Sequence, residues 1–337
     1  MNVQPEKLKA NDFASDQEVR WCPGCGDYAI LKALQRTMPD LGVKKEEVVF
    51  VSGIGCAARF PYYMSTFGFH TIHGRAPAFA TGIKIANPDL DVWVVGGDGD
   101  MLSIGGNHLI HVLRRNVNLQ LLIFNNEIYG LTKGQYSPTS RIGTRSPSTP
   151  SGSLESPISA VQLALGAGAR FIARSLDTDQ KHLPMVFSRA HKHTGTSLVE
   201  IFQNCIVYND GVFDGFTAKD VSAEKQIKLE DGKPLIYGKD RNKGLIIKKN
   251  SLELTSVELG EKYTESDLLV HNEKDRTLAN LLASMDSPDL PVAVGVIYCD
   301  PIETYDQLIS DQEKQANEDK PNLKINDIIN SGYTWKV

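Results

Sequence analysis

Short, mostly apolar runs alternate with helical stretches between residues 48 and 202 of the chain. The runs are VVFVSG, VWVVGG, LQLLIF, RFIARS and SLVEIF, and helices are expected at Asp27–Met38 before the first run and then at Pro77–Ala86, Met101–Arg115, Pro157–Gly166 and Asp179–His193. Strands that are apolar on both faces are typical of a parallel sheet covered on both sides by helices. We therefore predict an α/β fold with a doubly wound, mostly parallel sheet.

The predicted sheet gathers chemically useful side chains at one edge. Cys56, Asp98, Asn126 and Cys205 each follow closely after one of the apolar runs. The carboxyl ends of parallel strands meet at the same edge of a sheet, which is where such folds bind ligands. We expect these four residues to lie near one another.

A Gly-Asp-Gly sequence, Gly97–Gly99, follows the second apolar run. Its glycines let the backbone approach a diphosphate closely, and the free amides of the next helix favour anions. Asp98 offers magnesium a carboxylate oxygen, Asn126, 28 residues later, offers an amide oxygen, and Ile128 offers its carbonyl. This spacing of GDG and Asn-Asn is typical of thiamine diphosphate sites. The alternative is that both are only polar turns at strand ends.

The chain has five cysteines and no secretory signal in its N-terminal sequence, so a disulfide framework is not expected. Cys22 and Cys25, in WCPGC, leave three possibilities open. A thioredoxin-like dithiol normally follows a strand, which is not evident here, and a four-cysteine zinc site normally has two close pairs. Four thiolates from separate loops, beside small residues, suit a 4Fe-4S cluster. Cys299, in VGVIYCD, is expected to be a packing residue.

Charge and hydropathy argue against several classes of partner. The 36 basic and 41 acidic side chains give a net charge of -5, which offers no general attraction for nucleic acid. No apolar run approaches the roughly 20 residues needed to span a bilayer, so we expect no membrane contact and a cytoplasmic location. Basic residues between Lys228 and Lys249 form a local patch that suits an acidic protein partner.

The sequence pattern changes after residue 213. Lys228–Asn250 is typical of a strand, a turn rich in Gly, Asn and Asp, and a second strand. The charged tail from Ile302 is expected to be partly helical. We predict one domain over residues 1–213 and a C-terminal α+β extension over residues 214–337.

Six segments of the chain resemble the beta subunits of 2-oxoacid:ferredoxin oxidoreductases: WCPGCGDYAIL, GIGCAARF, HGRAPAFATGIKIANP, GDGD, NNEIYGLTKGQYSPTS and IFQNC, within residues 15–215. The resemblance implies that residues 1–213 form a pyrophosphate-type domain that binds thiamine diphosphate and a 4Fe-4S cluster. It implies coenzyme A-dependent oxidative decarboxylation of a 2-oxoacid, or the reverse reductive carboxylation. Single electrons would pass from thiamine diphosphate through the cluster to ferredoxin, while the protein supplies position and electrostatics.

The resemblance also implies roles for individual residues. The cluster would be held by Cys22, Cys25, Cys56 and Cys205. Magnesium would be held by Asp98, Asn126 and the carbonyl of Ile128. The diphosphate would be lined by Gly99, Asp100, Gly130, Leu131 and Thr132. The rest of the thiamine cofactor would contact His73, which would also serve catalysis, and the turn of Ile54, Gly55, Cys56 and Ala57.

Thiamine activation needs a carboxylate that this family takes from the pyrimidine-binding half of its site. The chain contains the pattern of only one α/β unit, the one that binds the diphosphate. The resemblance therefore implies an alpha subunit that supplies the activating glutamate and much of the coenzyme A site. It also implies a dimer of alpha-beta pairs, with the 214–337 extension at the interface between subunits.

The substrate is less tightly constrained. Lys133 could pair with a second carboxylate, which would favour 2-oxoglutarate over pyruvate, and Arg59 is a second candidate for this contact. A pyruvate or broad-specificity enzyme is the alternative within the family. Two other classes stay open: a non-redox thiamine decarboxylase with a structural zinc, and an electron-transfer module that binds a cluster but no thiamine.

Overall fold

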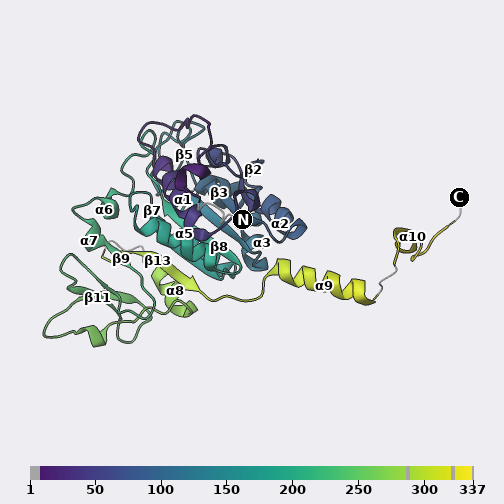
Figure 1. Ribbon diagram of the computed structural model, residues 1–337. Helices are drawn as coiled ribbons and strands as arrows, with labels where there is room; N and C mark the ends of the chain where they lie inside the picture. The colour runs from purple at the N-terminus through teal and green to yellow at the C-terminus, as the bar shows by residue number, and fades with distance from the viewer. Residues whose placement is uncertain (1–7, 286–288, 320–322, 336–337) are drawn as a thin grey trace, which may run out of the picture.

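The computed structural model describes residues 8–285, 289–319 and 323–335, so the first residues of the polar N-terminal arm lie outside it. Across the described residues one sheet has eight strands in the order β2-β1-β3-β4-β8-β7-β13-β9 (Figure 1). The strands are β1 Val48–Ser52, β2 Phe67–His70, β3 Asp91–Gly97, β4 Leu119–Asn125, β7 Phe171–Leu176, β8 Thr196–Phe202, β9 Gln226–Lys228 and β13 Val292–Cys299. From β2 to β7 all neighbours pair in parallel, and β13 pairs antiparallel with β7. The predicted α/β fold is confirmed.

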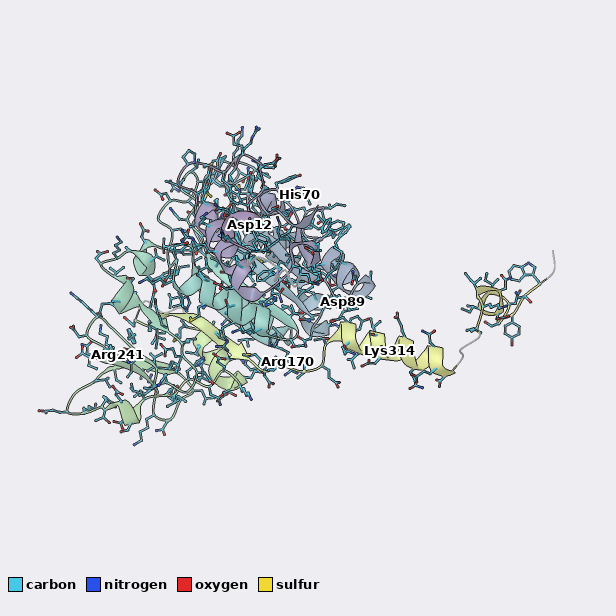
Figure 2. The ribbon with its side chains drawn as sticks, viewed as in Figure 1. Asp12, His70, Asp89, Arg170, Arg241 and Lys314 are labelled. Atoms are coloured by element: carbon cyan, nitrogen blue, oxygen red, sulfur yellow. The ribbon has the colours of Figure 1, made fainter. Side chains whose placement is uncertain are left out.

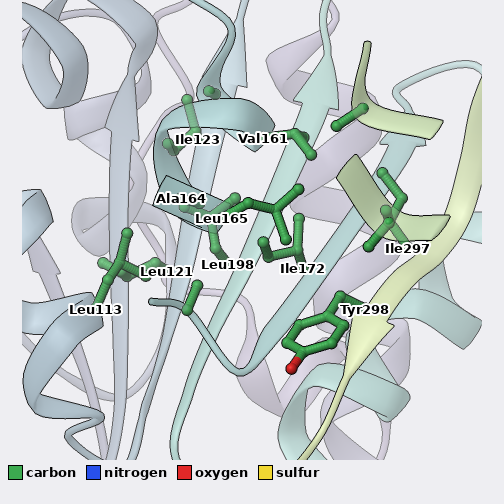
Figure 3. Packing of buried hydrophobic residues seen from close by; sticks show 14 of the residues in the cluster. Leu113, Leu121, Ile123, Val161, Ala164, Leu165, Ile172, Leu198, Ile297 and Tyr298 are labelled. Carbon is green, nitrogen blue, oxygen red and sulfur yellow. The ribbon is translucent and has the colours of Figure 1, made fainter. Parts of the chain in front are cut away.

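Helices cover both faces of this sheet because successive strand residues point to opposite sides and both sides are apolar. Val94 packs in one hydrophobic cluster, whereas its neighbours Trp93 and Val95 pack in the other. Figure 3 shows Val161 and Leu165 over the first of these faces. The first cluster includes residues of α2 Ala76–Ala86, α3 Gly106–Arg115, α4 Ala160–Gly166 and α8 Arg276–Ala283, and the second includes residues of α1 Asp27–Leu41 and α5 His182–Lys192.

The expected helix over Met101–Arg115 is interrupted. The chain instead forms a wide π-helical turn, η4, over Gly99–Ile104, and regular α-helix starts only at Gly106. The Gly105 amide donates to the Asp100 carbonyl at 3.1 Å, five residues back, and a Cβ on Gly105 would lie 2.4 Å from that oxygen. Such wide turns are frequent at functional sites. Here the turn begins directly after Asp98.

The C-terminal part does more than extend the domain. Two of its strands, β9 and β13, pair within the main sheet, and its residues share the first hydrophobic cluster. The predicted strand, turn and strand are present as a small antiparallel sheet, with β12 as an additional strand that we did not predict: β10 Ile236–Tyr237, β11 Lys243–Ile247 and β12 Leu254–Glu258. The predicted domain boundary at residue 213 therefore separates strands that belong to one continuous sheet.

The remaining elements are short or lie in the charged tail. The tail is partly helical as expected, and α9 leads away from the body of the molecule in Figure 1. In the part of the chain that the structure describes, no helix combines the length and apolar character needed to cross a bilayer. The elements are η1 Ala10–Phe13, η2 Lys45–Glu47, η3 Ala57–Tyr63, β5 Ile128–Tyr129, β6 Gln135–Tyr136, α6 Asp214–Thr217, α7 Ser222–Lys225, η5 Glu265–Asp267, α9 Tyr305–Asp319 and α10 Ile325–Ile329.

Cys299 ends β13, as expected for a packing residue, and lies beside a buried histidine. The Cys299 Sγ is 3.9 Å from His193 Nδ1, and the His193 ring packs on Phe171 with centroids 5.3 Å apart. Burial lowers the pKa of His193 from 6.5 to about 4. The folded state therefore keeps this ring neutral at a pH where the unfolded chain binds a proton.

We expect this histidine to make the protein acid-sensitive. The contribution of neutral His193 to the free energy of unfolding is fully present above pH 6.5 and is lost as the pH falls toward about 4. At pH 5 the loss amounts to about 2 kcal/mol. His193→Leu should therefore reduce the stability difference between pH 7 and pH 5 by about that amount in urea unfolding. His111→Leu, on a partly exposed helix position, is the control. An unchanged difference in His193→Leu would contradict this assignment.

Candidate functional site

The loops after β1, β3 and β4 meet in a cavity at the carboxyl edge of the sheet, which we call the strand-end cavity. All residues predicted to contact thiamine diphosphate line it: Ile54, Gly55, Cys56, Ala57, His73, Gly99, Asp100, Gly130, Leu131 and Thr132. The predicted magnesium ligands line it as well: Asp98, Asn126 and Ile128. The structure thus brings together segments that lie far apart in the sequence.

Asp98 lines this cavity and is held by a series of buried polar groups. Thr139 Oγ1 donates to Asp98 Oδ2 at 2.6 Å and lies 3.1 Å from Asn125 Oδ1. Asn125 Nδ2 donates to Glu200 at 2.9 Å, and Glu200 pairs with Arg174 at 2.7 Å. Burial raises the pKa of Asp98. A cation beside this carboxylate would offset the cost of its buried charge.

Asn126 follows β4 with its amide orientation fixed at both ends. Its Nδ2 donates to Gln203 Oε1 at 2.7 Å, and its Oδ1 accepts from the Ile128 amide at 3.2 Å. A carbonyl-type oxygen has a second lone pair, so Oδ1 keeps one for a hard cation. Asp98 and Asn126 therefore offer the oxygen types that magnesium prefers.

Asp100 ties together the two loops that border the cavity. Its Oδ1 accepts from the Ile54 amide at 3.1 Å and the Gly74 amide at 2.7 Å, and lies 2.5 Å from His73 Nδ1. Because Nδ1 faces a carboxylate, the proton of a neutral ring sits there and Nε2 keeps its lone pair. A Cβ on Gly53 would lie 2.1 Å from Asp100 Oδ2, so a larger residue there would displace the Asp100 carboxylate. The Asp100 side chain thus orients His73.

A second cavity adjoins the first and is lined by all four of the predicted cluster ligands, Cys22, Cys25, Cys56 and Cys205. We call it the cysteine cavity. A Cβ on Gly130 would lie 3.5 Å from Cys205 Sγ and 3.6 Å from Cys56 Sγ, so these sulfurs flank one residue. The two cavities share Cys56, Asn126 and Gly130 among their lining residues.

Burial favours the protonated thiol at Cys25, Cys56 and Cys205 in the protein alone. Burial, with the nearby Asp27 carboxylate, raises the pKa of Cys25 and raises that of Cys56 to about 12. A bound metal displaces such protons, since the ligand is the thiolate. Among the described residues, no three His, Cys, Asp or Glu side chains form a group that could hold a single metal ion. A 4Fe-4S cluster takes one thiolate on each of its irons.

Asp27 is a site residue that the sequence pattern did not single out. It is the first residue of α1, lines both cavities, and has no hydrogen-bond partner on Oδ1 among the described residues. Burial and the neighbouring Asp177 raise its pKa to about 7. Helices commonly begin with aspartate, so its position after CxxCG carried no separate signal.

Lys133 and Arg59 lie on the cysteine cavity, and neither is among the residues described as lining the strand-end cavity. Lys133 is exposed and has a left-handed backbone with φ of 74°. Arg59 Nη1 donates to the Arg20 carbonyl at 3.1 Å, and Arg59 also lines a surface cavity with Ile54 and Gly55. Both cations therefore lie at the cysteine cavity.

Comparisons with known proteins bear on this geometry. Residues 53–201 match the family model described as thiamine pyrophosphate enzyme, C-terminal TPP binding domain. The chain is 47% identical to the 2-oxoglutarate oxidoreductase subunit KorB of Mycobacterium tuberculosis, over 99% of this chain and 89% of that protein. The chain belongs to the 2-oxoacid:ferredoxin oxidoreductase beta-subunit family. The predicted resemblance is confirmed, and the loops after β3 and β4 belong to a TPP-binding domain.

Two further relatives are similar to this beta subunit over different shares of its length. The 2-oxoacid:ferredoxin oxidoreductase subunit beta of Saccharolobus solfataricus is 46% identical over 56% of this chain and 63% of its own length. A solved structure of 2-oxoglutarate:ferredoxin oxidoreductase from Magnetococcus marinus, with 2-oxoglutarate, coenzyme A and succinyl-CoA bound, superposes with a TM-score of 0.78 at 31% identity. That superposition covers 98% of this beta subunit and 97% of the Magnetococcus chain, so the C-terminal part is included.

Proposed function

We propose that this chain is the cofactor-bearing beta subunit of a 2-oxoglutarate:ferredoxin oxidoreductase. The reaction is the coenzyme A-dependent oxidative decarboxylation of 2-oxoglutarate to succinyl-CoA and CO2, or its reverse. The observation that carries the proposal is the pair of adjoining cavities, one suited to thiamine diphosphate and one lined by four cysteines. The names of the Mycobacterium and Magnetococcus relatives support 2-oxoglutarate as the substrate.

The strand-end cavity fits magnesium and thiamine diphosphate in its donor set. Asp98, the Asn126 side chain and the Ile128 carbonyl would hold the metal. Gly99 and Gly130 would line the diphosphate, and a Cβ on Gly99 would lie 2.2 Å from the Tyr129 ring, so glycine lets this ring pack against the loop. Thiamine supplies the stabilised carbanion of the reaction. His73, oriented by Asp100, is placed to accept or donate a proton at Nε2.

The cysteine cavity fits a 4Fe-4S cluster, which supplies one-electron acceptance. Its four thiol ligands come from three separate loops, and four cysteine thiolates are the ligand set of such a cluster. A colourless anaerobic preparation that contains zinc would favour the non-redox decarboxylase instead. A brown preparation that thiamine diphosphate and magnesium do not stabilise would favour the electron-transfer module.

An alpha subunit is required by this proposal. It would supply the activating glutamate and much of the coenzyme A site, in a dimer of alpha-beta pairs with the 214–337 part at the interface. Support comes from the three aspartates that line the strand-end cavity: Asp98 binds Thr139, Asp100 binds the loops at Ile54 and Gly74, and Asp27 also lines the cysteine cavity.

The test of the proposed function is anaerobic co-purification of this chain with its partner. The complex should turn over 2-oxoglutarate with coenzyme A and a one-electron acceptor, and this chain alone, loaded with cofactors, should not. Full activity of the isolated chain would remove the need for the alpha subunit. Absence of iron from the complex would remove the redox proposal itself.

We predict that Lys133 contributes to the choice between substrates. If Lys133 pairs with the second carboxylate of 2-oxoglutarate, Lys133→Ala should lower kcat/KM for this acid by about ten- to a hundredfold, the value of a contact of about 1.5 to 3 kcal/mol. The rate with pyruvate, which lacks that carboxylate, should change little. Arg59→Ala is the matched comparison, because Arg59 lies on the same cavity.

An equal loss with both acids would instead assign Lys133 to contact with the electron carrier. Ferredoxins are usually acidic, and Arg20, Arg59 and Lys133 all line the cysteine cavity. The basic patch predicted between residues 228 and 249 is less suitable. Lys243 pairs with Glu224 at 2.9 Å, and Figure 2 shows Arg241 far from His70, which lines a cavity beside Gly55. If Lys133→Ala loses more activity at low ionic strength than at high ionic strength, Lys133 contributes to docking of the electron carrier.

A further inference from the structure

Gln203 links the two cavities through its side chain. It follows β8 directly, is 1% exposed, and lines the cysteine cavity. Its Oε1 accepts from Asn126 Nδ2 at 2.7 Å. Its Nε2 donates to Cys25 Sγ at 3.3 Å and to the Asn204 carbonyl at 2.7 Å. One buried amide thus contacts a predicted magnesium ligand and a predicted cluster ligand.

The direction of this amide follows from its neighbours. Asn126 Oδ1 accepts from the Ile128 backbone amide, so the other end of the Asn126 side chain must be its NH2 group. That group requires an acceptor on Gln203, which is Oε1. The Gln203 NH2 group is therefore left to face Cys25 and the Asn204 carbonyl, and a reversed amide would place two donors against each other.

We propose that Gln203 is a positioning residue that couples the two cofactor sites, a role that rests on the proposed function. It holds the Asn126 side chain so that Oδ1 faces the magnesium position. It also donates an N–H to the Cys25 thiolate. Hydrogen bonds to cluster sulfur stabilise the more negative, reduced state, so this contact raises the cluster's reduction potential. Second contacts of this kind also set metal affinity.

Two substitutions separate the halves of this role. Gln203→Glu keeps an acceptor for Asn126 but replaces the donor to Cys25 with an anionic oxygen, whereas Gln203→Met keeps the length and removes both contacts. We expect both variants to shift the cluster potential to more negative values. Magnesium affinity should fall about tenfold in Gln203→Met and change less than about threefold in Gln203→Glu.

The measurements are a redox titration followed by electron paramagnetic resonance and a magnesium titration of the melting temperature with thiamine diphosphate present. Both use the anaerobic complex. Gln35→Met is the control, because Gln35 is a buried amide that donates to the Tyr63 carbonyl at 3.2 Å and lines neither cavity as described. This control should leave both quantities unchanged.

The outcomes distinguish this inference from the proposed function. A wild-type complex with no cluster signal or no magnesium effect would overturn both. A wild-type complex with both signals, together with Gln203 variants whose potential matches the wild type, would overturn the coupling alone. An equal shift of the cluster potential in Gln35→Met would also overturn the coupling, since the shift would then not depend on the contacts of Gln203. The expected pattern of two shifted potentials and one weakened magnesium site supports it.

Discussion

Asp98→Ala is expected to abolish the stabilisation that thiamine diphosphate and magnesium give to the protein. Asp98 is buried, lines the strand-end cavity and is the one carboxylate in the proposed magnesium set. Without it the ion loses its anionic protein ligand, and the diphosphate loses the ion that holds it. At ligand concentrations about 100-fold above Kd, the wild type should gain about 2.7 kcal/mol, and the variant should gain none.

The variant should remain folded without ligands, which makes the result interpretable. Burial raises the pKa of Asp98, so its charged form opposes folding and its removal does not take away a favourable ion pair. Asp89→Ala, at an exposed position, is the control and should keep the full thermal shift. An Asp98→Ala protein with the same shift as the wild type would place the cofactor elsewhere.

Cys56→Ser is expected to remove the cluster. Cys56 lines both cavities. Its Sγ and the Cys205 Sγ both lie beside Gly130. Serine is a poor ligand for iron in a site built for thiolates, so the anaerobically purified variant should lose most of its iron and its brown colour. Metal analysis and visible absorption measure this loss.

Cys299→Ser provides the matched control for the same chemistry. Cys299 ends β13 beside His193, and it is absent from the residues described as lining the cysteine cavity. This variant should keep its iron. Iron loss of equal size in Cys299→Ser would show that the cavity assignment is wrong, as would retention of iron in Cys56→Ser.

The sequence was sufficient to predict the fold and the edge of the sheet that carries the site. Apolar runs indicated parallel strands, and parallel strands bring Cys56, Asp98, Asn126 and Cys205 to one edge whatever the details of packing. The position of these residues relative to one another needed no knowledge of rotamers. This is why the predicted site residues come together at the linings of the two cavities.

Other features depend on contacts between distant segments and could not be read from local patterns. Gln203 and Thr139 matter through the amides and carboxylates that they meet across loops. The segment Gly99–Ile104 has an ordinary helical pattern in sequence, and its wide turn brings Gly105 close to the Asp100 carbonyl, a contact between backbone atoms that the pattern does not reveal. The pairing of β13 with β7 joins segments more than one hundred residues apart. Each was missed for the same reason.

Gly130 has one further consequence under the proposed function. Gly130 lines both cavities, and a Cβ there would lie 3.5 Å from Cys205 Sγ and 3.6 Å from Cys56 Sγ, so main-chain atoms of Gly130 would lie between the two cofactors. A contact made through main-chain atoms would not change when side chains switch rotamer. Electron transfer between the cofactors should therefore vary little with solvent viscosity, even when opening of the surrounding loops slows.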